Sequence, residues 1–85
     1  MSEHKPGCLA RSLAGHDKDR YFIILEEDGE YVAIADGKAR TAAQPKWKKK
    51  KHLQLVKEPL IDAFPVTDET IRSVIKSYQR SHCSI

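Results

Sequence analysis

The chain has 85 residues, of which 40% are hydrophobic and 32% are charged, and its formal net charge is +3 at pH 7. This length suffices for one small domain and leaves little room for a buried catalytic cavity. The composition is typical of a folded protein rather than a disordered one, and no apolar run is long enough to span a membrane. The two cysteines, Cys8 and Cys83, form no CxxC pair, so we expect reduced thiols.

The first third of the chain predicts a strand, a loop and a second strand. Residues 1–5 are polar and are expected to form a flexible tail; without the apolar core of a secretory signal, they favour a cytoplasmic protein. A strand is expected over residues 8–12 and a loop over residues 13–18. Residues 20–26 then carry the aromatic and β-branched side chains of a buried strand.

An Asp-Gly pair between two strand-like runs is a strong hairpin signal. Asp28-Gly29 therefore predicts a hairpin into a third strand over residues 31–35. Because side chains alternate along a strand, Val32 and Ile34 are expected to point inward and the other residues of this strand outward.

Asp36-Gly37 predicts a second turn, followed by a short fourth strand over residues 39–42 and a basic loop. Residues 53–56 alternate again and predict a fifth strand. Short strands joined by tight turns indicate a mainly β fold. We expect a small twisted antiparallel barrel over residues 6–57, since closing the sheet removes its exposed edges.

The C-terminal third predicts a connector, a helical segment and a flexible end, over residues 58–66, 67–81 and 82–85. Prolines at both ends of the connector favour an irregular path that lays Leu60 and Phe64 onto the barrel. Thr67 is a good N-cap for a helix over residues 68–80. The spacing i, i+3, i+4, i+7 gives this helix one apolar face, expected to pack on the barrel, made of Ile71, Val74, Ile75 and Tyr78.

Positive charge is concentrated in residues 38–57, which contain no Asp or Glu. Acidic residues cluster in residues 26–30, so we expect an electrostatically two-faced molecule. Lysine side chains suit phosphate contact, whereas Trp47 has two interpretations: it stacks on an unpaired base, or it pins this loop to the barrel. The basic residues of the segment are Lys38, Arg40, Lys46, Lys48, Lys49, Lys50, Lys51 and Lys57.

The loop over residues 13–18 is the second candidate binding element. Gly15 permits a backbone conformation closed to other residues, and Lys18 and Arg20 are placed to reach phosphates. Asp17 is interpreted as a turn residue that holds the loop, and His16 as a further candidate for hydrogen bonding to RNA.

These elements together resemble the KOW motif, a strand-loop-strand unit of ribosomal proteins and of transcription and translation factors. Over residues 6–56 the chain is similar to small bacterial KOW-domain RNA-binding proteins related to KOW-type large-subunit ribosomal proteins. Asp19 stands where the family pattern has glycine. The resemblance implies an SH3-like barrel that binds RNA. It rests on Gly7, Leu9, Ser12 and Arg20 and on residues 14–18, 22–24, 35–40 and 45–52.

The sequence carries no Gly-rich phosphate loop, no nucleophile elbow and no recurrent metal-ligand spacing among its four histidines. We therefore expect no enzyme activity, metal or cofactor. We expect a monomer that binds structured RNA, above all ribosomal RNA, with ribosomal proteins as further partners. The alternatives are a protein-interaction module of the translation or transcription machinery and a DNA-associated role. The expected RNA-binding residues are Gly15, His16, Lys18, Arg20, Lys38, Arg40, Lys46, Trp47, Lys48, Lys49, Lys50, Lys51 and His52.

Overall fold

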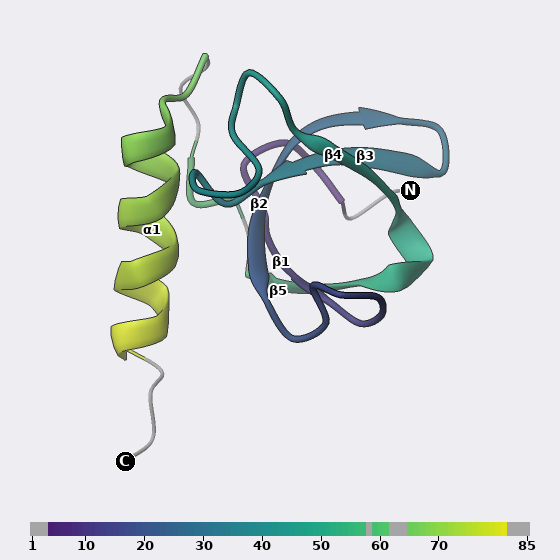
Figure 1. Ribbon diagram of the computed structural model, residues 1–85, viewed down its shortest axis with the longest axis horizontal. Coiled ribbons are helices and arrows are strands. Elements are labelled where there is room, and N and C mark those ends of the chain that lie inside the picture. The colour runs from purple at the N-terminus through teal and green to yellow at the C-terminus, as the bar shows by residue number, and fades with distance from the viewer. Residues whose placement is uncertain (1–3, 58, 62–64, 82–85) are drawn as a thin grey trace.

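The computed structural model of the protein describes residues 4–57, 59–61 and 65–81. In this part of the chain, five strands form one antiparallel sheet and one α-helix follows them, so the mainly β class with a C-terminal helix is confirmed (Figure 1). The elements are β1 (Leu9–Ser12), β2 (Tyr21–Asp28), β3 (Tyr31–Ala35), β4 (Lys46–Lys49), the 3-10 helix η1 (Lys50–His52), β5 (Leu53–Lys57) and α1 (Asp68–Ser81).

The sheet has the strand order β4-β3-β2-β1-β5 and is open, with β4 and β5 at its two edges. Closure into a barrel is therefore not confirmed. The sheet nevertheless curls strongly, and β2 runs from the β3–β4 pair to the β1–β5 pair (Figure 1). Two register shifts account for part of this bend, because an extra residue increases local twist. Leu25 is the extra residue in β2, and Val56 is the extra residue in β5 opposite Leu9 and Ala10.

One hydrophobic cluster fills the concave side of the sheet. Val32 and Ile34 of β3 belong to it and are fully buried, as the alternation predicts. Ala33 and Ala35 on the other face are fully buried too, so this strand is covered on both sides, which a two-residue period does not predict. The buried residues of this cluster are Cys8, Ala10, Phe22, Ile24, Val32, Ile34 and Leu53.

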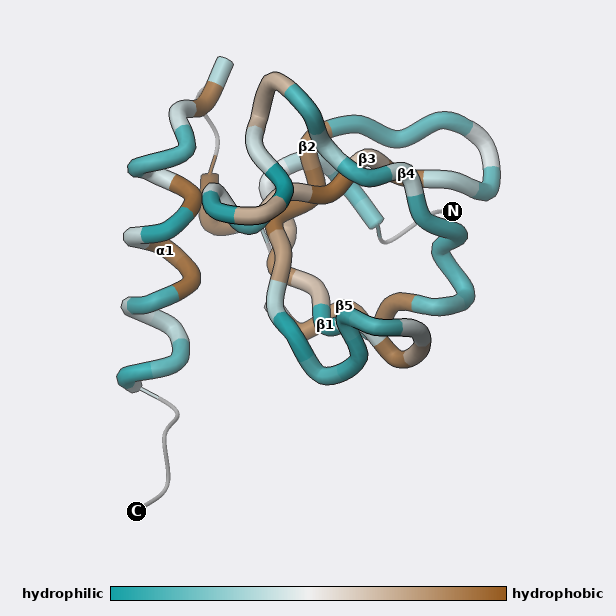
Figure 2. The backbone as a smooth tube through the Cα atoms, viewed as in Figure 1, coloured by the Kyte–Doolittle hydropathy of each residue, from teal (hydrophilic) through white to brown (hydrophobic). Residues whose placement is uncertain are grey.

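A second cluster lies on the outer face, where α1 packs against the sheet. Ile71 is fully buried and Ile75 is 9% exposed, which confirms the expected packing of the apolar helix face. Figure 2 shows the hydrophobic bands of α1 on its side toward the sheet. Tyr78 adds a ring contact with Tyr21 at a centroid distance of 5.7 Å. The buried residues here are Leu9, Ile23, Ala35, Ile61, Ile71 and Ile75.

The first turn of α1 is fixed to the turn after β3. The amide of Thr70 donates to Thr67 Oγ1 at 3.2 Å, which confirms the expected N-cap. Asp68 Oδ1 accepts the amide of Ala42 at 2.7 Å. Gly37 has φ of +79° and a Cβ there would lie 2.5 Å from the carbonyl oxygen of Asp68, so only glycine permits this close approach.

The predicted strand over residues 39–42 is wrong, and the fourth strand is instead β4, Lys46–Lys49, within the expected basic loop. Asp36 Oδ1 accepts the amides of Lys38 and Arg40, and these bonds hold residues 36–40 in a turn. β4 pairs with β3 on one side only. A lysine-rich sequence suits such an edge, because charged side chains oppose pairing with another chain.

In the connector, Ile61 rather than Leu60 enters the core. Leu60 is 39% exposed and its amide donates to the carbonyl of Gly7 at 2.9 Å, whereas Ile61 is 6% exposed. Phe64 and the expectations for residues 1–3, 58, 62–64 and 82–85 fall outside the described residues. The described residues include no helix with the length and apolar character needed to cross a membrane.

Candidate nucleic-acid interface

The register of β4 divides the basic stretch between two faces of the sheet. Lys48 pairs with the inward residue Val32 of β3, whereas Trp47 and Lys49 alternate with it and lie on the outer face. Lys46 is opposite Ile34 and shares the inward side with Lys48. The lysines are therefore not equivalent, and only some of them remain in solvent.

Lys46 and Lys48 meet a carboxylate from the first loop, and we call this group the Asp17 cluster. Lys48 Nζ lies 2.8 Å from Asp17 Oδ1 and donates to the carbonyl of Ala14 at 2.9 Å. Lys46 Nζ lies 2.9 Å from Asp17 Oδ2, and the Ser12 hydroxyl donates to Oδ1 at 2.7 Å. Asp17 and Lys48 are each only 8% exposed. In the described chain no ladder of backbone hydrogen bonds joins the first loop to the edge strand β4, so the Asp17 cluster makes this connection.

The electrostatics of the cluster favour an ionised Asp17. Burial raises the pKa of Asp17, but hydrogen bonds from Lys48, Ser12 and Lys46 lower it, and the net result is a pKa well below its usual range. Two ammonium groups facing one carboxylate leave the cluster with a net positive charge. The expectation of a hydrated, phosphate-binding Lys48 does not match its burial, since its ammonium already has two acceptors.

Acid is expected to destabilise the fold through Asp17. Its carboxyl titrates near 3.8 without these partners, and folding lowers this pKa, so the folded state binds the proton less readily than the unfolded chain. The stability that ionised Asp17 contributes is fully present above its pKa in the unfolded chain. It is lost as the pH falls through its pKa in the folded protein. Urea midpoints measured from about pH 6 to about pH 2 should therefore fall more steeply for wild type than for Asp17→Asn/Lys48→Met. Parallel curves for the two proteins would contradict this prediction.

The first loop closes tightly although a non-glycine residue, Asp19, stands at its end. Asp19 has φ of +70°, a region that aspartate tolerates better than most residues. Its amide donates to the carbonyl of Ser12 at 2.8 Å, and the amide of Ser12 donates to the carbonyl of Arg20 at 3.0 Å. Gly15 has φ of +86°, as expected for its role. His16, Lys18 and Arg20 are exposed.

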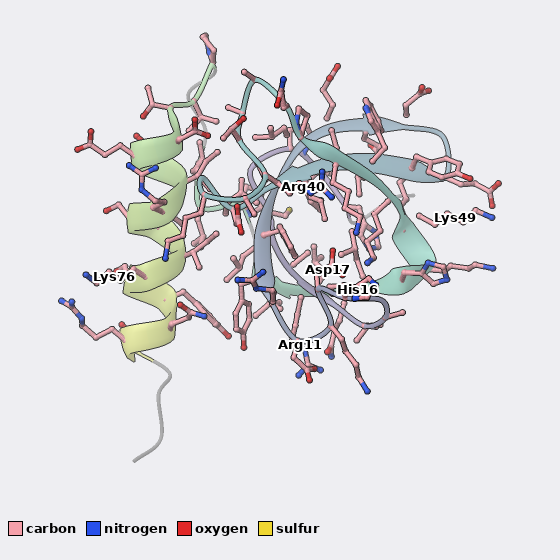
Figure 3. All side chains as sticks on the ribbon, in the orientation of Figure 1. Arg11, His16, Asp17, Arg40, Lys49 and Lys76 are labelled. Carbon is pink, nitrogen blue, oxygen red and sulfur yellow. The ribbon has the colours of Figure 1, made fainter. Side chains whose placement is uncertain are left out.

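A small pocket of about 160 Å³ lies where the first loop, the 36–40 turn and β4 meet. Four residues from the sequence-predicted set line it, although they are far apart in the chain: His16, Arg20, Arg40 and Lys46. Figure 3 labels two of them, His16 and Arg40, together with Asp17 of the loop. The other lining residues are Asp17, Phe22, Asp36 and Ala39.

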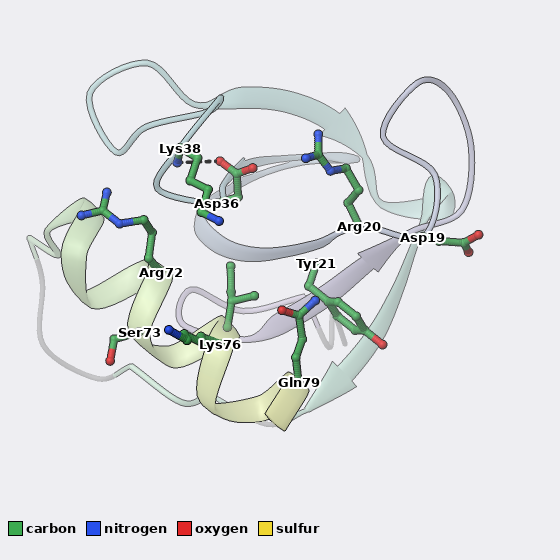
Figure 4. A pocket seen from close by; sticks show the side chains of 10 residues that line it. Asp19, Arg20, Tyr21, Asp36, Lys38, Arg72, Ser73, Lys76 and Gln79 are labelled. Carbon is green, nitrogen blue, oxygen red and sulfur yellow. Dashed lines mark hydrogen bonds between the residues drawn. The ribbon is translucent and has the colours of Figure 1, made fainter. Parts of the chain in front are cut away.

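A larger groove of about 740 Å³ separates α1 from the start of β2 and the 36–40 turn (Figure 4). Arg20 and Lys38 of the predicted set line its sheet side. Arg72 and Lys76 of α1 line the opposite side and were not predicted. The helical spacing of Arg72 and Lys76 places them off the apolar face, and this was the only sign in the sequence that they are exposed. Their position opposite the loop cations depends on how α1 packs against the sheet.

The outer face of β4 presents an aromatic surface with a cation. Trp47 is 48% exposed and Tyr31 of the neighbouring strand is 43% exposed. Lys49 Nζ lies 5.8 Å from the centroid of the Tyr31 ring. Trp47 pairs with the fully buried Ala33, so one part of it covers the sheet while the rest faces solvent. Figure 3 places Lys49 at the opposite end of the curled sheet from α1 and Lys76.

Lys50, Lys51 and His52 form η1, next to the acidic hairpin. The side chain of Lys50 forms an ion pair with Glu27, and its amide donates to the carbonyl of Glu30 at 2.8 Å. The expected separation of acidic and basic faces is therefore wrong at this point. Lys51 is exposed, and the carbonyl of His52 accepts the amide of Leu13 at 2.9 Å, which holds the first loop from its other side.

Across residues 4–57, 59–61 and 65–81, no three His, Cys, Asp or Glu side chains gather so as to hold a metal ion. The cationic surface formed by the first loop, the 36–40 turn, β4 and α1 is instead the main chemical feature of this part of the chain. No protein-family model matches the chain, and no curated protein matches it either.

Proposed function

We propose that this protein binds structured RNA, above all ribosomal RNA, through the first loop, the 36–40 turn and β4. The observation that supports this most is the small pocket. Its cations Arg20, Arg40 and Lys46, together with His16, come from three separate segments and converge on one site. Such convergence suits an anion, and guanidinium groups bind phosphate oxygens with two parallel hydrogen bonds.

The carboxylates beside this pocket already have partners. Asp36 Oδ1 accepts two backbone amides, and both oxygens of Asp17 accept lysine ammonium groups. Arg20 and Arg40 are exposed, so a phosphate reaches them without breaking the Asp17 cluster. In this mechanism, phosphates replace counterions around the exposed cations, while Asp17 and Lys48 fix the loop against β4.

The same proposal includes the finer fold assignment. The curled sheet, with β1 between β2 and β5 and with a strand-loop-strand unit at its start, supports an open variant of the SH3-like KOW barrel. In that assignment the first loop is the family's RNA-contacting loop, and Asp19 replaces its glycine through a left-handed backbone conformation.

The salt dependence of RNA affinity tests this proposal. With about five phosphates contacted, the logarithm of the association constant should fall against the logarithm of salt concentration with a slope of roughly −3.5 to −4.5. The variant Arg20→Gln/Arg40→Gln should reduce the magnitude of this slope by roughly 1.4 to 1.8, at 0.7 to 0.9 for each lost contact. Fluorescence anisotropy with a labelled ribosomal RNA fragment measures both.

The matched control is Lys5→Gln/Arg80→Gln, which removes the same charge at exposed positions outside the pocket and the groove. Its slope should equal that of wild type. An affinity that ignores salt, or equal losses in both double variants, would contradict an RNA interface at this pocket. Binding to an isolated ribosomal protein with no RNA present would instead support the protein-interaction alternative.

A further inference from the structure

The groove between α1 and the sheet carries cations on both of its sides. Arg72 and Lys76 are one helical turn apart on α1, which places their Cβ atoms about 5 to 6 Å from each other. Arg20 and Lys38 lie across from them on the sheet side. In Figure 4 these side chains surround the opening of the groove. Four cations from three separate segments thus border one elongated space.

Two acidic side chains, Asp19 and Asp36, also line the groove, which leaves four cations against two carboxylates. Asp36 Oδ1 accepts backbone amides, including that of Lys38, as the dashed line in Figure 4 marks. The carboxylate of Asp19 lies 3.7 Å from Nη1 of Arg11, a residue that does not line the groove. Among the described residues, no groove cation forms an ion pair with a carboxylate. Nη1 of Arg72 donates to the carbonyl of Gly37 at 2.6 Å, which holds the guanidinium group against the turn.

The floor of the groove is partly apolar. Ile75 is 9% exposed and Tyr21 is half-buried beside it. A surface of this kind accepts a ribose or a base, while the cations above it accept phosphates. The volume of about 740 Å³ gives room for more than one phosphate group.

The groove adjoins the small pocket, because Arg20 and Asp36 line both. We propose that the groove holds the phosphodiester backbone of an RNA strand that passes on from the pocket, so that α1 forms the second side of the RNA interface. This rests on the proposed RNA-binding function. The adjacency of the two sites favours an extended polyanion over a free nucleotide, which would occupy the groove alone.

The variant Lys38→Gln/Lys76→Gln tests this assignment, since both side chains are exposed and neither belongs to the hydrophobic core. Compared with wild type on the same RNA fragment, its salt slope should fall in magnitude by roughly 1.4 to 1.8 for two lost phosphate contacts. Lys5→Gln/Arg80→Gln again provides the control of equal charge and should leave the slope unchanged. Thermal unfolding monitored by circular dichroism should show that both variants remain folded.

Each outcome distinguishes this inference from the function on which it rests. If wild type binds no RNA, both are overturned. If wild type binds RNA and the groove variant has the slope of the control, the groove assignment is wrong and the pocket interface stands. Binding of adenosine monophosphate provides the last comparison. If Lys38→Gln/Lys76→Gln loses binding of this nucleotide but binds RNA as the control does, the groove is a site for free nucleotides and the inference is overturned.

Discussion

Replacing Asp17 with asparagine is expected to lower the free energy of unfolding by about 3 to 5 kcal/mol, because it leaves a buried ammonium without its counter-charge. Lys48 is 8% exposed, and its ammonium group donates to the carbonyl of Ala14 and to the carboxylate of Asp17, of which only the carboxylate is charged. Small domains have total stabilities of about 5 to 15 kcal/mol, so this loss is a large fraction of the whole. Urea unfolding followed by circular dichroism measures it.

A double-mutant cycle separates the ion pair from other effects of the substitution. Lys48→Met retains most of the buried stem, and Asp17 keeps Ser12 and Lys46 as donors, so this single change should cost less than Asp17→Asn. In Asp17→Asn/Lys48→Met neither buried charge is left, and most of the lost stability should return. Additive losses from the two single changes would show that the pair is uncoupled and would contradict the structural role assigned to the cluster.

Replacing Trp47 with alanine is expected to weaken binding to an RNA hairpin with an unpaired loop by roughly 5- to 150-fold. This range corresponds to about 1 to 3 kcal/mol for one base stacked on an aromatic side chain. The expectation follows from the proposed function and from the position of Trp47, which is 48% exposed beside Tyr31 and Lys49. Anisotropy titration at constant salt gives the dissociation constants.

Two further substitutions separate stacking from packing at this position. Trp47→Phe keeps an aromatic face and should retain most of the affinity, whereas Trp47→Leu keeps apolar cover over Ala33 and should lose it. Unfolding of Trp47→Ala under conditions where wild type is folded would assign the residue to the support of the sheet. Equal affinities for the phenylalanine and leucine variants would contradict base stacking.

Local signals predicted most elements of the fold correctly. Asp28-Gly29 between two strand-like runs located the hairpin of β2 and β3, and β3 was predicted with its observed bounds. The N-cap Thr67 and the spacing i, i+3, i+4, i+7 of the apolar side chains located α1. These features are determined by residues close together in sequence, and tertiary context did not override them.

The errors arose where a distant partner decides the structure. The segment Lys46–Lys49 is so rich in lysine that it was expected to be a loop, yet pairing with β3 makes it a strand. Two of its three lysines, Lys46 and Lys48, then turn inward, where Asp17 stabilises them. No local pattern indicates this, because the two partners are about thirty residues apart along the chain.

The sequence indicated only part of the candidate binding surface, because distant contacts also decide which cations remain in solvent. Residues of the first loop and of the basic stretch were chosen by charge, and the structure brings four of them to the small pocket, among them Arg40. The same criterion also selected the buried Lys48 and the ion-paired Lys50. Arg72 was overlooked because its position opposite the loop depends on how α1 packs against β2.

The most direct measurement of RNA binding at this surface is ultraviolet cross-linking of the protein to a ribosomal RNA fragment, followed by mass spectrometry of the RNA-linked peptides. We expect links within residues 16–20 and 38–47, which contain the pocket cations and Trp47. Links confined to the acidic hairpin of residues 26–30, or an absence of links in a sample that binds the RNA, would contradict the proposed interface.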